Sequence, residues 1–315
     1  MRNQTTITKF ILIGFLYLRH LEFLIAVGFL ASYLLILSAN IMIIAIIHSD
    51  RHLHSPMNFF LWNLSCLEIL FTSSVLPKVI ASFLTGDRSI SYLACITQCY
   101  FYSLLDCSEF VLLAIMSYNC YVAICNPLCY TMVMNAKLCF QLVVGSWATG
   151  FLATIIPTIL VFTLLFCNAN QIDHFFCDGL ALVKLSCVDT SFVELLSFMT
   201  SSAILLGFLI LTVVSCTYIV ATIFRTTSHS GLNKAFSTCS SHFIIITMGY
   251  GSCIFMYVQP SGSDISLNKL VALLNTVVTP LMSPFIFSMR NQQMKDSVRA
   301  ALKRSMNFSR KHINF

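Results

Sequence analysis

Long apolar runs separated by short polar gaps follow one another along nearly the whole chain. Each of seven runs is long enough to cross about 30 Å of hydrocarbon as a helix that rises about 1.5 Å per residue. The pattern predicts an all-α membrane protein, in which residues 23–290 form a bundle of seven transmembrane helices between an N-terminal segment (1–22) and a tail (291–315). The predicted spans are approximately 23–47, 57–80, 94–123, 138–162, 194–224, 235–258 and 269–290.

The amino-acid composition supports a membrane protein. Hydrophobic residues make up 57% of the chain and charged residues 10%, whereas a soluble domain has about 25% charged residues. The formal net charge of +6 does not indicate nucleic-acid binding, because the charges gather in the gaps and in the tail, as they do in membrane proteins. The bilayer is therefore the first predicted partner.

The placement of Lys and Arg predicts the orientation. The gaps after the first, third and fifth runs, together with the tail, carry many basic residues and few acidic ones. The other gaps mix both signs, so the basic set is expected to be cytoplasmic and the N-terminus extracellular. A glycosylation acceptor at Asn3, in the triplet Asn-Gln-Thr, agrees with this orientation.

Four of the 14 cysteines fall on the predicted outer side. Cys95 lies at the outer end of the third run, and Cys167, Cys177 and Cys187 lie in the long loop after the fourth. Four cysteines in an oxidising compartment form up to two disulfides, although free thiols are the alternative. The remaining cysteines lie mostly in spans or near the cytoplasm, where they are expected to be small reduced hydrophobes.

Four short motifs are more specific, and each lies at a consistent face of the predicted membrane. They are "HLHSPM" (His52–Met57), "MSYNCYVAICNPLCY" (Met116–Tyr130), "KAFSTCSSH" (Lys234–His242) and "PLMSPFIFSMRN" (Pro280–Asn291). With these motifs the chain resembles the vertebrate odorant (olfactory) receptors, of the tetrapod-type class and family six, within the rhodopsin-like G-protein-coupled receptors. The resemblance implies a seven-helix bundle followed by a short amphipathic helix in the tail.

The resemblance also implies a function. Such a receptor lies in the plasma membrane, binds a small volatile odorant in the outer half of the bundle and activates a heterotrimeric stimulatory G protein. It further implies the disulfide pairs Cys95–Cys177 and Cys167–Cys187. No cofactor or structural metal is expected. An enzyme is disfavoured because no metal cluster or nucleophile triad occurs at a water-accessible face, and a transporter because duplicated broken helices are missing.

Ionisable residues inside membrane spans are costly, which makes them functional candidates. Glu68 and Glu109 occupy positions where odorant receptors carry acids that face the bundle axis. With Asn40 and Ser283 they are predicted to hold a sodium ion, water or a shared proton, because two neighbouring carboxylates do not readily ionise together. The alternative is a structural hydrogen-bond network in which one acid is protonated.

Asp106 is the sharper candidate for ligand binding. It lies three residues before Glu109, on the same helix face, and about one turn nearer the outside. A desolvated carboxylate favours an amine or another strong hydrogen-bond donor, whereas the alternative is a protonated acid bonded to a neighbouring hydroxyl. The other predicted ligand contacts are Tyr102, Leu105, Tyr250, Ile254 and Tyr257.

The family ends its third span with Asp-Arg-Tyr, and here the same place reads Asn119-Cys120-Tyr121. A thiol has neither the charge nor the planar donor fork of arginine, so we expect weakened G-protein coupling. The alternative is a receptor-like membrane protein that folds and binds a ligand without signalling. The residues assigned to the G-protein switch are Asn119, Cys120, Tyr121, Cys216, Lys234 and Phe287, of which Cys216 and Phe287 replace tyrosines of the family.

Overall fold

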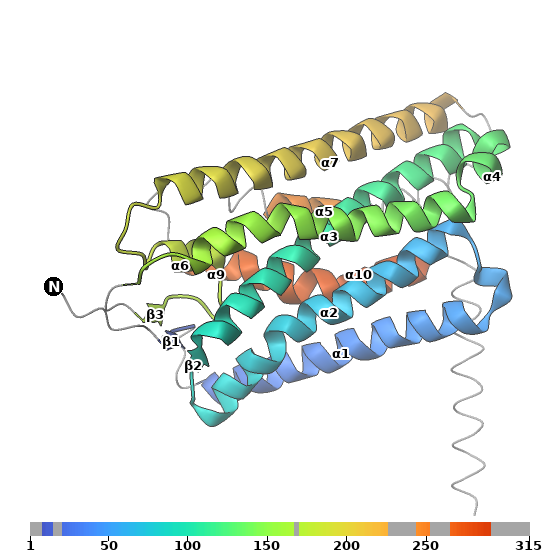
Figure 1. The fold of residues 1–315 in the computed structure, drawn as a ribbon. Coiled ribbons are helices and arrows are strands. Elements are labelled where there is room, and N and C mark those ends of the chain that lie inside the picture. Colours follow the sequence, from blue (N-terminus) through green and yellow to red (C-terminus); the bar gives the residue numbers. More distant parts are fainter. Residues whose placement is uncertain (1–7, 15–20, 167–169, 226–243, 253–264, 291–315) are drawn as a thin grey trace, which may run out of the picture.

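A computed structural model describes residues 8–14, 21–166, 170–225, 244–252 and 265–290. Five long helices dominate these residues (Figure 1): α1 (Glu22–Ser49), α2 (Pro56–Thr85), α3 (Tyr92–Cys125), α5 (Ala136–Phe162) and α7 (Ser191–Arg225). A further continuous helical segment contains α9 (Ile265–Leu273), the π-helical turn η4 (Leu274–Val278) and α10 (Thr279–Arg290). Shorter helical elements are η2 (Arg51–Leu53), η3 (Pro127–Cys129), α4 (Tyr130–Val133) and α6 (Gly179–Val183).

Six helices of the described residues are long and apolar enough to cross a membrane: α1, α2, α3, α5, α7 and Leu267–Phe287. The predicted sixth span, 235–258, is described only at 244–252, where it is helical. Observed helices extend beyond the expected limits, most clearly α2, which continues through Pro77 to Thr85 instead of ending near residue 80. The predicted amphipathic helix falls on 291–315, outside the described residues.

Capping residues explain where several of these helices begin. The side chain of Ser55 accepts a hydrogen bond from the backbone N–H of Asn58 (3.3 Å), and Pro56 occupies the first turn of α2. Ser91 and Asn135 cap α3 and α5 in the same manner. Such side chains satisfy N–H groups that have no partner within the helix, and a proline in the first turn loses nothing. Gly86 ends α2 in the left-handed conformation, with φ of 74°.

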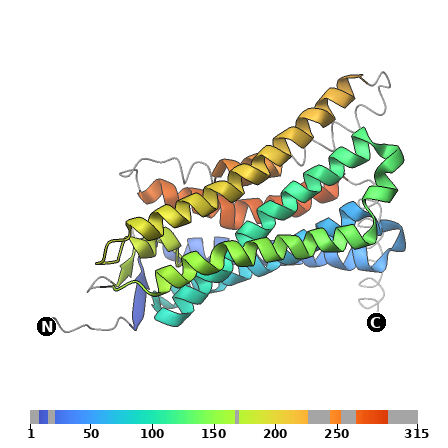
Figure 2. The ribbon, with the colours of Figure 1, turned by 45° about the horizontal axis from the view of Figure 1, so that its top comes forward.

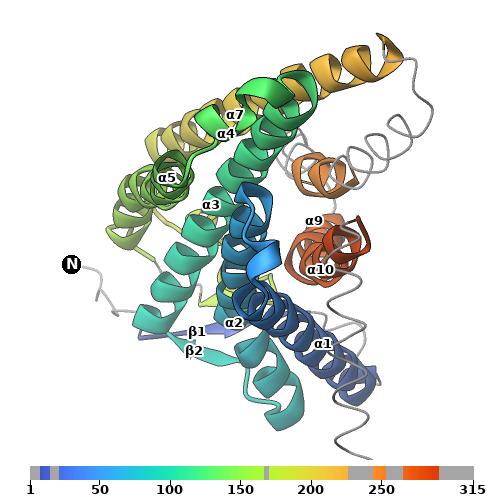
Figure 3. The ribbon, with the colours of Figure 1, turned by 90° about the vertical axis from the view of Figure 1, so that its right-hand side faces the viewer.

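The third helix, α3, lies in the middle of the bundle. It packs against α2, α5 and α7, and it crosses between the other helices when the bundle is viewed from its end (Figure 3). In the apolar stretch of α3 that could cross a membrane, 72% of the residues are buried inside the protein, against 22% for α5 and for α7. Close packing with α5 depends on Gly150, where a Cβ atom would lie 2.2 Å from Oγ of Ser108. Functional groups on α3 are therefore enclosed by its neighbours.

One end of the bundle carries a small sheet that the hydrophobic pattern did not predict. Strand β1 (Lys9–Leu12) pairs antiparallel with β2 (Ser89–Ser91) and parallel with β3 (Gln171–Ile172). Phe10 and Leu12 point inward from β1 and are buried. We call this the sheet end and the opposite end, where α3 finishes, the far end; Figures 1 and 2 show both.

Candidate functional site

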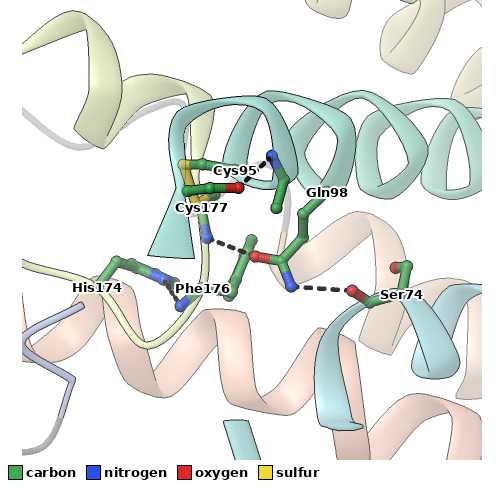
Figure 4. The surroundings of a disulfide bond; sticks show 8 residues. Ser74, Cys95, Gln98, His174, Phe176 and Cys177 are labelled. Carbon is green, nitrogen blue, oxygen red and sulfur yellow. Dashed lines mark hydrogen bonds between the residues drawn. A yellow bond between two sulfur atoms is a disulfide. The ribbon is translucent and has the colours of Figure 1, made fainter. Parts of the chain in front are cut away.

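The sheet end is closed by a disulfide and a glutamine bridge (Figure 4). The predicted Cys95–Cys177 disulfide is confirmed and joins α3 to the loop before α6. Beside it, Oε1 of Gln98 accepts a hydrogen bond from the backbone N–H of Cys177 (3.0 Å), while Nε2 donates to the carbonyl of Ser74 (2.9 Å). Cys187 is disulfide-bonded, but its predicted partner, Cys167, lies outside the described residues, so this pairing stays a prediction.

We call the disulfide, the Gln98 bridge and the loop around Asp173 the cap of the bundle. A buried lysine joins α9 to this cap. Lys269 is only 5% exposed, and its ammonium donates to Oδ1 of Asp173 (2.6 Å) and to the carbonyl of Gly14 (2.9 Å). The loop that contains Asp173 continues into Phe176, whose ring lies 4.6 Å from that of Tyr102, between centroids. Tyr102, a predicted ligand contact, thus packs directly beneath the cap.

Asp106 lies deeper in the bundle, and its partner comes from the π-helical turn. Nδ2 of Asn275 donates a hydrogen bond to Oδ1 of Asp106 at 3.0 Å. The neighbour is therefore a carboxamide rather than the hydroxyl considered as the alternative. Asn275 is buried and was absent from the sequence-based site. A polar residue in an apolar run was the only signal for it, because the sequence does not reveal where the π turn falls.

The remaining predicted ligand contacts divide among several places. Tyr250 is buried, and its hydroxyl donates to the carbonyl of Phe110 (3.3 Å). Leu105 lines a cavity of about 770 Å³ between α2, α3 and α5, together with residues such as Phe101 and Trp147. Ile254 and Tyr257 lie outside the described residues.

The predicted polar network lies around Glu68, which is 1% exposed. Its carboxylate faces Asn40 and Ser283, yet neither of its oxygens has a hydrogen-bond partner within the described part of the chain. The side chain of Asn40 donates to its own helix, at the carbonyl of Ile36 (3.1 Å). Glu109 is also buried, and the charges of Glu68 and Asp106 act on it. Three carboxyl groups thus share one region of the bundle.

At the far end, the switch residues are held by neutral contacts. Oδ1 of Asn119 accepts a hydrogen bond from the hydroxyl of Tyr130 (3.1 Å), and Nδ2 lies 3.4 Å from Sδ of Met57. Cys120 packs in an apolar cluster with Ile219 and Ile223 of α7.

The structure describes three further residues of the predicted G-protein switch. The ring of Tyr121 lies 5.7 Å from that of Tyr218, between centroids. Phe287 is buried, and Cys216 is partly buried. Lys234 lies outside the described residues.

Comparison with known proteins decides what this bundle is. The family model described as "Olfactory receptor" matches residues 29–305. The chain belongs to the olfactory receptor family. It is 47% identical to Olfactory receptor 6E1 from Mus musculus over 311 residues, covering 98% of this chain and 99% of that protein. It is also 47% identical to Olfactory receptor 6C76 from Homo sapiens over 313 residues, covering 99% of this chain and 100% of that one.

The resemblance seen in the four motifs is thereby confirmed. This olfactory receptor is a multi-pass membrane protein and a G-protein-coupled odorant receptor with the seven-transmembrane fold of its family; it is not an enzyme. Membership also favours a signalling receptor over the non-signalling reading.

Proposed function

We propose that the receptor binds its odorant between α3 and the α9–α10 segment, with Asp106 as the polar anchor. The hydrogen bond from Asn275 to Asp106 carries this proposal. A carboxylate inside a transmembrane bundle is costly, which makes it a functional candidate, and sites for small ligands combine an apolar lining with a few oriented polar groups. Basic odorants are the preferred class, because an ammonium forms a charge-assisted hydrogen bond with a carboxylate.

The receptor is placed in the plasma membrane with its sheet end and N-terminus outside, where Asn3 is glycosylated. The excess of Lys and Arg in the gaps and tail on the other side supports this orientation. The Cys95–Cys177 disulfide at the sheet end supports it independently, since such bonds persist in oxidising compartments. The far end then faces the cytoplasm and a stimulatory G protein.

Coupling at the far end is proposed to be weak, because Asn119 and Cys120 stand where the family has an acid and an arginine. Wild type and the Asn119→Asp/Cys120→Arg variant should be compared in cells by odorant-evoked cAMP, normalised to surface expression. We expect a larger response from the variant at equal surface density. A strong wild-type response with no gain in the variant would contradict weak coupling, and a response through calcium alone would contradict the stimulatory G protein.

We also propose that Glu68 and Glu109 share a sodium ion or a proton. The two oxygens of Glu68 without partners fit a bound cation, which would be held by Glu68, Glu109, Asn40 and Ser283. A cation there would neutralise the paired carboxylates. If it binds, replacing sodium by choline should lower the melting temperature of the purified receptor, and Glu68→Gln should abolish that difference. An equal melting temperature in both salts favours the shared proton.

A further inference from the structure

We infer that Asn275 is a specificity-determining residue that, with Asp106, admits odorants that donate a hydrogen bond and rejects odorants that only accept one. The inference rests on the proposed function, in which Asp106 contacts the odorant. It adds a second residue, from the α9–α10 segment, and a rule that says which chemical classes of odorant bind.

The geometry of the pair commits one of the two N–H groups of Asn275 to the carboxylate of Asp106. Nδ2 of Asn275 already donates to Oδ1 of Asp106. Asn275 is 5% exposed, whereas Asp106 is only partly buried. Beyond that bond, the pair has two acceptor atoms for a ligand, the second oxygen of Asp106 and the amide oxygen of Asn275, and one remaining donor, the second N–H of Asn275.

The π turn explains why Asn275 faces Asp106 at all. Ser283, which faces Glu68, follows Asn275 after eight residues. In a regular α-helix this separation would turn the two side chains about 80° apart. The π turn Leu274–Val278 takes up roughly one additional residue, which reduces the difference to about 20°. One face of the α9–α10 segment thus meets both acids, in line with the frequent placement of π turns at functional sites.

The chemistry of the pair separates three odorant classes. An ammonium has three donors and no acceptor, so it suits a site that offers acceptors. A hydroxyl donates to Asp106 and still accepts from Asn275. A ketone has acceptors only; it is able to accept the remaining N–H of Asn275, but its oxygen then lies beside the carboxylate of Asp106 and donates nothing to it. Rejection thus comes from a built-in mismatch, which is how many specific sites exclude competitors.

A matched set of probes tests the rule. Heptan-2-amine, heptan-2-ol and heptan-2-one share one carbon skeleton and differ at the polar group. Their binding is measured as ligand-dependent thermal stabilisation of the purified full-length receptor, a readout that does not require G-protein coupling. Wild type is expected to bind the amine most tightly, then the alcohol, and the ketone at least about tenfold more weakly than the alcohol.

Removing the acid should convert the specificity rather than abolish binding. In Asp106→Leu we expect the affinity for the amine to fall by about tenfold or more and the affinity for the ketone to rise about tenfold, because the carboxylate no longer opposes the ketone oxygen and both N–H groups of Asn275 become available. In Asp106→Leu/Asn275→Leu the ketone gain should disappear. Asn63→Leu is the matched control: Asn63 is a buried asparagine whose side chain bonds within its own helix, at the carbonyl of Phe59, and the order of the probes should not change.

The outcomes separate the inference from the proposed function. If Asp106→Leu changes the binding of none of the probes, Asp106 does not anchor the odorant, and both the proposed function and the inference fail. If the amine weakens but the ketone does not gain, or if the gain survives in the double variant, Asp106 stands and the role of Asn275 is overturned. Surface expression is measured for each variant, and Asp106→Asn, which keeps the size of the side chain, replaces Asp106→Leu if the latter fails to fold. A wild type that binds neither donor probe also overturns the inference.

Discussion

The two ends of the bundle hold their polar groups in different ways. At the sheet end, a disulfide and two ion pairs join distant segments beside the neutral Gln98 bridge: the Cys95–Cys177 disulfide, the Lys269–Asp173 pair, and a pair between Arg88 and Glu22 at 2.5 Å. At the far end, neutral side-chain contacts join the described segments, as in the Tyr130–Asn119 bond and the 3.2 Å contact of Cys125 with Thr222, while the charged Asp50 accepts a local bond from the backbone N–H of His52.

This difference separates a rigid region from one that is suited to change. Charge-assisted bonds are about twice as strong as neutral ones, so we expect the sheet end to keep a single arrangement above the proposed odorant site. Neutral bonds contribute about 1 kcal/mol each, so the helices at the far end are able to exchange one packing for another when a ligand shifts the populations. The proposed G-protein face at this end has Cys120 in place of the arginine that would form an ion pair.

The largest effect should come from breaking the disulfide. Cys177→Ser opens a link between residues 82 apart in the sequence, and removal of a native disulfide typically costs about 2–5 kcal/mol. We expect most of the receptor to be retained inside the cell. The measurement is the ratio of surface to total receptor by antibody labelling.

The control for the disulfide comes from the far end. Cys129 is a free and exposed cysteine, and Cys129→Ser should leave the surface ratio unchanged. Equal losses in the two variants would show that the receptor is sensitive to any cysteine replacement, and the contrast between the ends would no longer follow from the disulfide.

A smaller loss is expected from Asp173→Asn, which leaves the buried ammonium of Lys269 with a neutral partner and the carbonyl of Gly14. Leaving a buried charge without its counter-charge costs about 3 kcal/mol. Lys269→Met should cost less, because Asp173 is 44% exposed at its side chain and is hydrated when the lysine is gone. The melting temperature of the purified receptor measures both.

The informative result is which of the two variants, Asp173→Asn or Lys269→Met, loses more stability. If Lys269→Met is the more damaging change, the lysine acts through packing rather than through its charge. The double variant Asp173→Asn/Lys269→Met should resemble Lys269→Met alone, since the unpaired cation is then absent.

The spans, the family motifs and the acids could be read from the sequence because each is a local property of the chain. Asp106 and Glu109 stand out in an apolar run, and three residues of helix place them on one face. Asn119 and Cys120 stand out for the same reason, because flanking residues define what the family has there. The Cys95–Cys177 disulfide could be predicted only from the resemblance to the family.

What the sequence left hidden depends on contacts between distant segments. Asn275 meets Asp106 only because a π turn changes the register of the helix before Ser283. The sheet formed by β1, β2 and β3 pairs short strands from three separate regions, each too brief to show a period. Lys269 bonds Asp173 and Gly14, which lie 96 and 255 residues away from it in the sequence.

At the far end, Tyr130→Phe should lower the free energy of unfolding by about 1 kcal/mol, because Oδ1 of the buried Asn119 loses the hydroxyl that donates to it. In the Asn119→Asp background the same change should cost about 2 kcal/mol, since the bond is then charge-assisted. Melting temperatures of the four proteins measure the difference. Tyr218→Phe, at an exposed ring beside Tyr121, is the control. Equal losses in both backgrounds would show that Tyr130 does not contact residue 119.

The smallest effect expected is a loss of stability in mild acid that arises at the sheet end through His174. Burial lowers the pKa of His174, and the positive charge of Lys269 lowers it further, although Asp178 and Asp173 oppose both. The unfolded chain binds the proton near the ordinary pKa of about 6.5. The stabilisation is therefore complete above this pH and is lost as the pH falls through the lower pKa of the folded state.

His174→Gln should remove part of the fall in melting temperature between about pH 7.5 and pH 5.5, a window that contains the ordinary titration of histidine. His52→Gln is the matched control, because His52 is exposed near the far end and should not alter the fall. A decline of the same size in wild type and in His174→Gln would place the acid sensitivity elsewhere. Because the opposing charges around His174 are themselves part of the cap, Asp173→Asn should enlarge the decline that His174→Gln reduces.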